Sequence, residues 1–144
     1  AIVISNRERR QERAADKFDD TVELAVKFPH LEDDDFILKY ENDYKEFHKL
    51  DNSGKTSNKN QQHPDSERYL RYEIYCVKIL NAIETLWVAY GRDLDKVQKK
   101  YYLSEILGIH KFWFNQNFEM NKEAYPEELM LALREVLLTS RHDE

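Results

Sequence analysis

Two carboxylates near the middle of the chain are the residues best placed to do chemistry. Glu73 and Glu84 are eleven residues apart in one continuous helical pattern, a spacing of about three turns that puts both on one helix face. Glu73 falls inside the apolar stripe of that helix, where a carboxylate needs a partner to offset its lost hydration. We expect Arg71, His110 or a tyrosine hydroxyl to supply it. Two interpretations follow: a structural carboxylate, paired or reaching solvent at the helix edge, or a ligand or interface site.

An aromatic run forms the second candidate. Phe112, Trp113 and Phe114 are adjacent, so on a helix they cannot all face one core. At least one of them is expected to contact another helix, a second subunit or solvent. Tryptophan is frequent among the anchor residues of protein interfaces. Core packing and an oligomer interface are the two interpretations of this run.

Motifs for metal, phosphate and hydrolase chemistry are missing from the sequence. No Glu is followed three residues later by His, and His-Glu-x-x-His and Gly-x-Ser-x-Gly are absent. Gly54-Lys55-Thr56 resembles the end of a phosphate-binding loop but has Lys49 where that loop needs glycine. The single cysteine, Cys76, lies in an apolar stripe and is expected to be a buried thiol. We therefore predict no metal, no cofactor and no catalytic residue.

Composition and charge narrow the class of protein. The chain has 144 residues, the size of one domain, with 41% apolar and 35% charged residues and only 3 Gly and 3 Pro. Its formal net charge of −6 opposes nucleic-acid binding. The densest basic segment is diluted by Glu8 and Glu12, and its four arginines are Arg7, Arg9, Arg10 and Arg13.

Apolar residues recur at helical spacing along most of the chain. We predict helices over 5–28, 33–50, 64–90 and 93–107, a further helix or packed turn at 109–114, and a last helix from Pro126. The prediction is an all-α fold, a helical bundle of five to six helices, in a single domain over 1–144. It comprises an N-terminal helical hairpin (5–50), a long polar loop (51–63) and a C-terminal helical part (64–140).

The segment 64–90 is predicted to be the central helix, because its apolar face is the broadest. It is expected to end at Gly91 in a left-handed cap, and Gly108 is expected to break or kink the helix that follows. The main stripe of the central helix is Leu70, Cys76, Val77, Leu80, Ile83, Trp87 and Tyr90, widened by Tyr69, Tyr72, Ile79 and Leu86.

The first residues of the chain have two interpretations. The apolar segment 2–4 precedes an arginine cluster, an order that matches the last turn of a membrane span and its cytoplasmic flank. The alternative is a frayed terminus left after removal of the initiator methionine. We expect a cytoplasmic location, and a membrane tether only through a segment upstream of Ala1.

The central part of the chain resembles a group of uncharacterised bacterial helical domains that follow N-terminal membrane spans. The matching residues are Tyr69–Glu73, Ile79–Glu84, Gly91 and the pattern His110-Lys111-x-Trp113. The resemblance covers about a third of the chain and agrees with a membrane-proximal position. It implies no activity and names no catalytic residue.

Two functional hypotheses come from these patterns. The first is a non-enzymatic interaction or regulatory module with a protein partner or self-association, in which Phe112, Trp113 and Phe114 provide contact surface. The alternative is a helical bundle that binds a small ligand, or acts as an enzyme, through a pocket near Glu73, Glu84 and His110.

Overall fold

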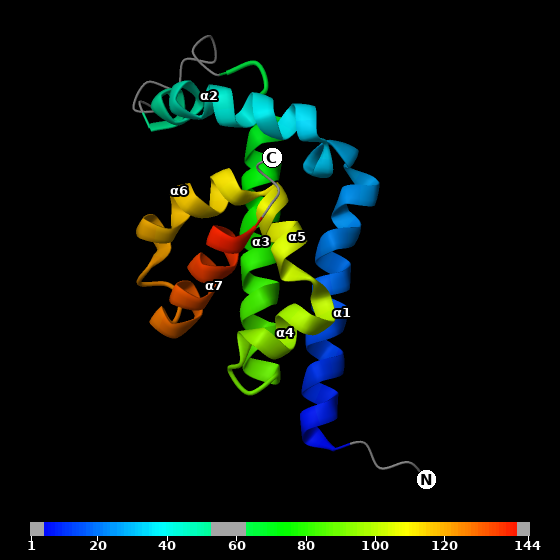
Figure 1. The fold of residues 1–144 in the computed structure, drawn as a ribbon. Helices are drawn as coiled ribbons and strands as arrows, with labels where there is room; N and C mark the ends of the chain where they lie inside the picture. The colour runs from blue at the N-terminus through cyan, green and yellow to red at the C-terminus, as the bar shows by residue number, and fades with distance from the viewer. Residues whose placement is uncertain (1–4, 53–62, 141–144) are drawn as a thin grey trace.

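The computed structural model describes residues 5–52 and 63–140 (Figure 1). These residues form seven α-helices and one short 3₁₀ helix and contain no strand, which confirms the all-α class and corrects the expected count of five to six. The elements are α1 (Asn6–Lys27), η1 (Pro29–Glu32), α2 (Asp34–Asn52), α3 (Ser66–Ala89), α4 (Leu94–Tyr101), α5 (Leu103–Ile109), α6 (Lys111–Asn121) and α7 (Glu127–Thr139). The apolar segment 2–4 and most of the predicted polar loop, including Gly54-Lys55-Thr56, lie outside the described residues.

Local signals explain several of the helix ends. The Ser5 hydroxyl accepts a hydrogen bond from the amide of Glu8 at 3.2 Å and caps α1. The Asp93 carboxylate caps α4 in the same way. Gly91 has a φ of 75°, so the left-handed turn expected after the central helix is confirmed.

The extra helix comes from a break at Tyr102, not at Gly108. Tyr102 has a φ of 52° and separates α4 from α5, whereas Gly108 is a buried residue inside α5. The Gln98 side chain accepts a hydrogen bond from the Ser104 amide at 2.9 Å, which stabilises the chain reversal. Non-glycine residues rarely adopt this conformation, so the sequence carries no local signal for it.

Helix α3 is the centre of the molecule (Figure 1). Helix α1 lies alongside it, α2 crosses its N-terminal end, and α4 to α7 gather around its remaining length. The N-terminal segment 5–50 is therefore not a hairpin of two packed helices: η1 turns the chain, and α1 makes its main contacts with α3. The Lys17 ammonium reaches the Thr85 hydroxyl at 3.0 Å across that contact.

The buried face of α3 differs from the predicted stripe. Cys76, Ile79 and Ile83 are fully buried, but Leu70 and Val77 are 38% and 39% exposed, and Ile74 is 57% exposed. Apolar residues occupy almost every face of α3, so spacing alone allows several orientations of the helix. The tyrosines of the widening set, Tyr69 and Tyr72, prove to face the core.

Helix length and apolarity bear on the membrane question. Within 5–52 and 63–140, no helix is both long enough and apolar enough to cross a bilayer.

Candidate functional site

Three tyrosines of α3 hold the surrounding elements to the central helix. Tyr69 donates to Asp43 of α2, Tyr72 to His110 at the start of α6, and Tyr75 to Glu32 of η1, each at 2.6 Å. All three rings are buried. Because each hydroxyl bonds a different element, α3 positions α2, η1 and α6 around one polar network.

The most buried part of this network is a chain of three groups. Tyr72 donates to Nδ1 of His110 at 2.6 Å, and Nε2 of His110 lies 2.8 Å from Glu32. His110 has no exposed surface. Burial raises the pKa of Tyr72 well above its usual value, so the phenol keeps its proton and donates it. Nδ1 is then its acceptor, and Nε2 on the other side of the ring donates to the carboxylate.

Cys76 lies beside this chain and is fully buried, as predicted. Burial raises the pKa of its thiol well above the usual value. A thiol without thiolate character is a poor nucleophile. The side chain is therefore part of the core packing of α3.

Glu73 belongs to a separate cluster between α2 and α3. Its Oε2 atom accepts hydrogen bonds from Tyr40 at 2.5 Å and from Nε2 of His48 at 2.7 Å. Of the expected partners, a tyrosine hydroxyl makes the contact, and the second partner, His48, was not anticipated. Burial, followed by the charge of Glu73, raises the pKa of Tyr40. These two hydrogen bonds join α2 to α3.

The structure does not bring Glu73, Glu84 and His110 together in one site. Glu73 and Glu84 are separated by about 16 Å along α3, and His110 bonds Tyr72 and Glu32 instead. Glu84 is half-buried near Tyr125. Burial is the main cause that raises the pKa of the Tyr125 phenol, and the charge of Glu84 adds to it. Glu73 and Glu84 lie on one face of α3 but not in one site, because α2 covers one end of this helix and the C-terminal helices cover the other end.

The aromatic run packs on the protein's own core. Trp113 is 2% exposed and Phe114 fully buried, with ring centroids 5.1 Å apart. Phe112 is half-buried and meets Tyr44 edge-to-face at 5.3 Å. Of the two interpretations of this run, the burial of Trp113 and Phe114 favours core packing, and Phe112 packs on Tyr44 of α2.

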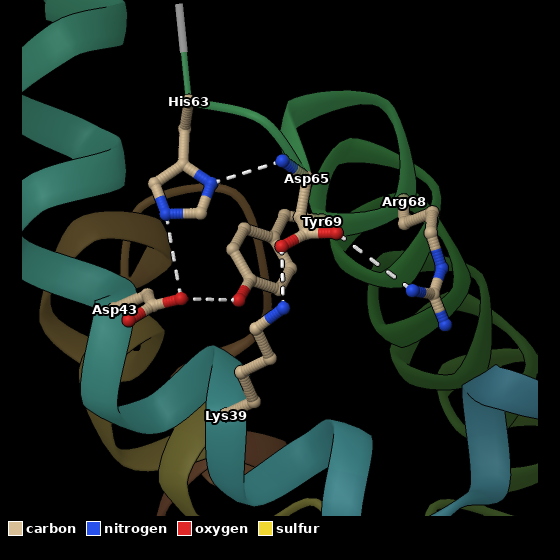
Figure 2. Close-up of polar contacts among 6 residues, drawn as sticks. All are labelled: Lys39, Asp43, His63, Asp65, Arg68 and Tyr69. Carbon is tan, nitrogen blue, oxygen red and sulfur yellow. Dashed lines mark hydrogen bonds and ion pairs between the residues drawn. The ribbon is translucent and has the colours of Figure 1, made fainter.

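A cluster at the start of α3 combines two aspartates with a histidine (Figure 2). Asp65 receives the Lys39 ammonium at 2.6 Å and lies 3.7 Å from the Arg68 guanidinium. The hydrogen bond from Lys39 is the main cause that lowers the pKa of Asp65. The negative charge of Asp65 is thus already balanced by cations of the protein.

The histidine of this cluster is oriented as a donor. Nδ1 of His63 accepts a hydrogen bond from the amide of Asp65 at 3.0 Å, and its Nε2 faces Asp43 at 3.4 Å (Figure 2). Nε2 therefore carries the hydrogen in the neutral ring, whereas a metal ligand needs its lone pair there. Asp43 also accepts from Tyr69 at 2.6 Å. The arrangement fits a clasp between α2 and α3 better than a metal centre.

A pocket lies next to the Glu32–His110 pair, with Glu32 in its lining. Its volume is about 270 Å³, and it lies between α1, η1, α3 and the α4–α5 turn. Glu32 and Tyr75 line it from the network, and Tyr101, Tyr102 and Glu105 line it from the turn. Sequence reasoning missed this site, because its residues come from five elements and the left-handed Tyr102 gives no sequence signal.

Comparison with known proteins adds no relative. No family model matches the chain, and no curated protein or solved structure gives a match.

Proposed function

We propose that this chain is a non-enzymatic helical interaction module that pairs with a second copy of itself through α3. The observation that carries the proposal is the aliphatic stripe of Leu70, Ile74 and Val77, which are 38%, 57% and 39% exposed. Their spacing of four and then three residues puts them on one face of the helix. A continuous aliphatic stripe on the central helix is a typical docking surface for another helix.

The charges beside this stripe favour an antiparallel second copy. Glu67 and Lys78 lie on the same edge of the stripe, one near each end. In an antiparallel pair with a two-fold axis near Ile74, equal edges meet, so Glu67 of each copy approaches Lys78 of the other. A register that puts Leu70 opposite Val77 brings Glu67 opposite position 80, two residues or about 3 Å from Lys78. Apolar and charged contacts therefore favour the same antiparallel arrangement to within about 3 Å.

The internal chemistry supports a non-enzymatic role. His110 uses both ring nitrogens in hydrogen bonds to Tyr72 and Glu32, and Glu73 receives two donors. Burial raises the pKa of Cys76 and Tyr72, so neither is an activated nucleophile. These groups are engaged in holding helices together.

Sedimentation velocity of the full chain over a wide concentration range tests the proposal. We expect a reversible dimer that Ile74→Glu abolishes, because the substitution puts two charges at the two-fold axis. Leu131→Glu on α7 is the matched control, since Leu131 is 56% exposed and Ile74 57%. A chain that stays monomeric at high micromolar concentration, or a dimer equally sensitive to both substitutions, would contradict self-pairing through α3.

A charge exchange tests the register. Glu67→Lys and Lys78→Glu should each weaken the dimer about fivefold, as expected for two symmetric surface ion pairs. The double variant restores both pairs and should return the dissociation constant to that of the natural chain. Additive weakening in the double variant would refute the antiparallel arrangement.

A further inference from the structure

The pocket beside Glu32 has an unusual set of lining side chains. Its cavity of about 270 Å³ is lined by two carboxylates and four aromatic rings: Glu32, Glu105, Phe18, Tyr75, Tyr101 and Tyr102. The other lining residues are aliphatic side chains of α1 and α5, and none of the described lining residues is Lys, Arg or His. Acidic and aromatic groups without a base favour a positively charged occupant.

The polar network holds the Glu32 carboxylate in place at this pocket. Oε1 of Glu32 lies 2.6 Å from the Tyr75 hydroxyl and 2.8 Å from Nε2 of His110. A carboxylate that accepts two hydrogen bonds is stabilised in its ionised form. Nε2 of His110 donates to it, while Nδ1 meets the Tyr72 hydroxyl at 2.6 Å. The carboxylate of Glu32 is therefore held in place by two donors.

The aromatic walls are also held in place. The rings of Phe18 and Tyr101 meet edge-to-face, with centroids 5.4 Å apart. Tyr102 has a φ of 52° and is 70% exposed at the pocket. Glycine or asparagine normally occupies such a left-handed position, and strained residues of this kind concentrate at binding sites. The left-handed backbone thus carries an exposed aromatic ring on the lining of this acidic pocket.

We propose that this pocket binds a small organic cation of the quaternary-ammonium class. The aromatic faces attract the diffuse positive charge of such a group, and Glu32 and Glu105 add two negative charges. The volume is just below the range of about 300–1,000 Å³ typical of drug-sized ligands, so the occupant is a small head group. The site is independent of the α3 stripe, because it lies on the side of α3 that faces α4 and α5.

Choline and its neutral isostere 3,3-dimethyl-1-butanol provide the test, because they differ chiefly in the charge of the branched centre. Each is titrated into the full chain and followed by amide chemical shifts. We expect saturable shifts at Glu32, Tyr102 and Ile106 with choline, and binding of the isostere weaker by about tenfold or more. Equal affinity for both probes, or no saturable shift with choline, would overturn the proposal.

Two variants connect the binding to particular residues. Tyr102→Gly removes the ring but fits the left-handed backbone, so the fold is kept while choline affinity falls by about fivefold. Glu105→Gln should weaken choline and leave the isostere unchanged, and Glu128→Gln is its matched control in the first turn of α7. Full choline affinity in both Tyr102→Gly and Glu105→Gln would place the cation elsewhere and refute the site.

Binding must also be separable from self-association. The Ile74→Glu variant leaves every residue of the pocket unchanged, so it should bind choline with the affinity of the natural chain. Loss of choline binding in this variant would mean that the shifts report the dimer instead of the pocket.

Discussion

Removal of the His110 side chain should be among the most destabilising single changes in this protein. His110→Ala leaves the buried Tyr72 hydroxyl without the acceptor it now meets at 2.6 Å, at a cost of about 1–3 kcal/mol. The ring is fully buried, so its loss also leaves a cavity worth about 2 kcal/mol. Glu32 keeps its hydrogen bond from Tyr75. The free energy of unfolding should therefore fall by about 3–5 kcal/mol, from a typical total of about 5–15 kcal/mol.

A second substitution distinguishes the unpaired hydroxyl from the cavity. In the double variant His110→Ala, Tyr72→Phe the orphaned hydroxyl is gone, so unfolding should cost about 1–2 kcal/mol more than in His110→Ala alone. Tyr75→Phe in the same background is the matched control. It deletes a hydroxyl that still has Glu32 as its partner, so it should lower stability further.

Urea unfolding followed by circular dichroism measures all four variants, with Tyr72→Phe alone as the fourth in case His110→Ala does not fold. Tyr72→Phe should cost about 1 kcal/mol, because it leaves Nδ1 of His110 without its donor. The reasoning fails if His110→Ala costs less than about 1 kcal/mol. It fails equally if Tyr72→Phe and His110→Ala destabilise additively, since contacting residues should couple.

Four further predictions concern pH, backbone and metal. Burial, helped by the charges of nearby arginines, lowers the pKa of His30, and the Nε2 atom of this ring has no hydrogen-bond partner among the described residues. Below about pH 6.5 the unfolded chain binds a proton that the folded chain does not, so the free energy of unfolding decreases as the pH is lowered. His30→Phe should reduce the dependence of the melting temperature on pH between about pH 5.5 and 8. An unchanged dependence would contradict the assignment to His30. Burial is the largest cause that raises the pKa of Tyr101 to about 12. Above about pH 10 this tyrosine loses its proton in the unfolded chain before it does so in the folded chain, so stability declines. Tyrosinate absorbance in an alkaline titration should therefore show ionisation that is delayed until the protein unfolds. Gly91→Ala should cost about 1 kcal/mol in urea unfolding, because φ is 75° and an added Cβ meets nothing within 4 Å, so that only backbone strain is tested. Zn²⁺ should leave the melting temperature unchanged, because the Asp43–His63–Asp65 cluster presents a donor at Nε2 of His63; a rise that His63→Ala removes would disprove this.

Sequence reasoning succeeded where the determining contacts are local. The Ser5 cap, the left-handed Gly91 and the positions of the longer helices all depend on residues within about four positions of each other. The same reasoning placed Cys76 in the core and gave Glu73 a tyrosine partner. It failed at Tyr102, where a non-glycine residue takes a glycine conformation, and at Leu70 and Val77, where several apolar faces of α3 competed for one core.

The candidate site was beyond that reach for a different reason. Glu32 and His110 are 78 residues apart and meet only because η1 and the start of α6 pack beside the same turns of α3. Neither residue belongs to a motif, and the sequence placed His110 with Glu73 instead. The aromatic run shows the same limit: three adjacent rings suggested surplus surface, but Trp113 and Phe114 are buried and Phe112 packs against Tyr44 of α2.

The sequence by itself determined the helical class, the main helices and their caps, because backbone hydrogen bonding and side-chain periodicity act over a few residues. Only the tertiary structure decided which face of α3 is buried and which remains as an aliphatic stripe. It also decided that Glu32, His110 and Tyr72 form one chain of hydrogen bonds beside an aromatic pocket. The physical reason is that helix spacing sets the angle of each side chain about its own axis, whereas the neighbour it meets depends on how whole helices pack.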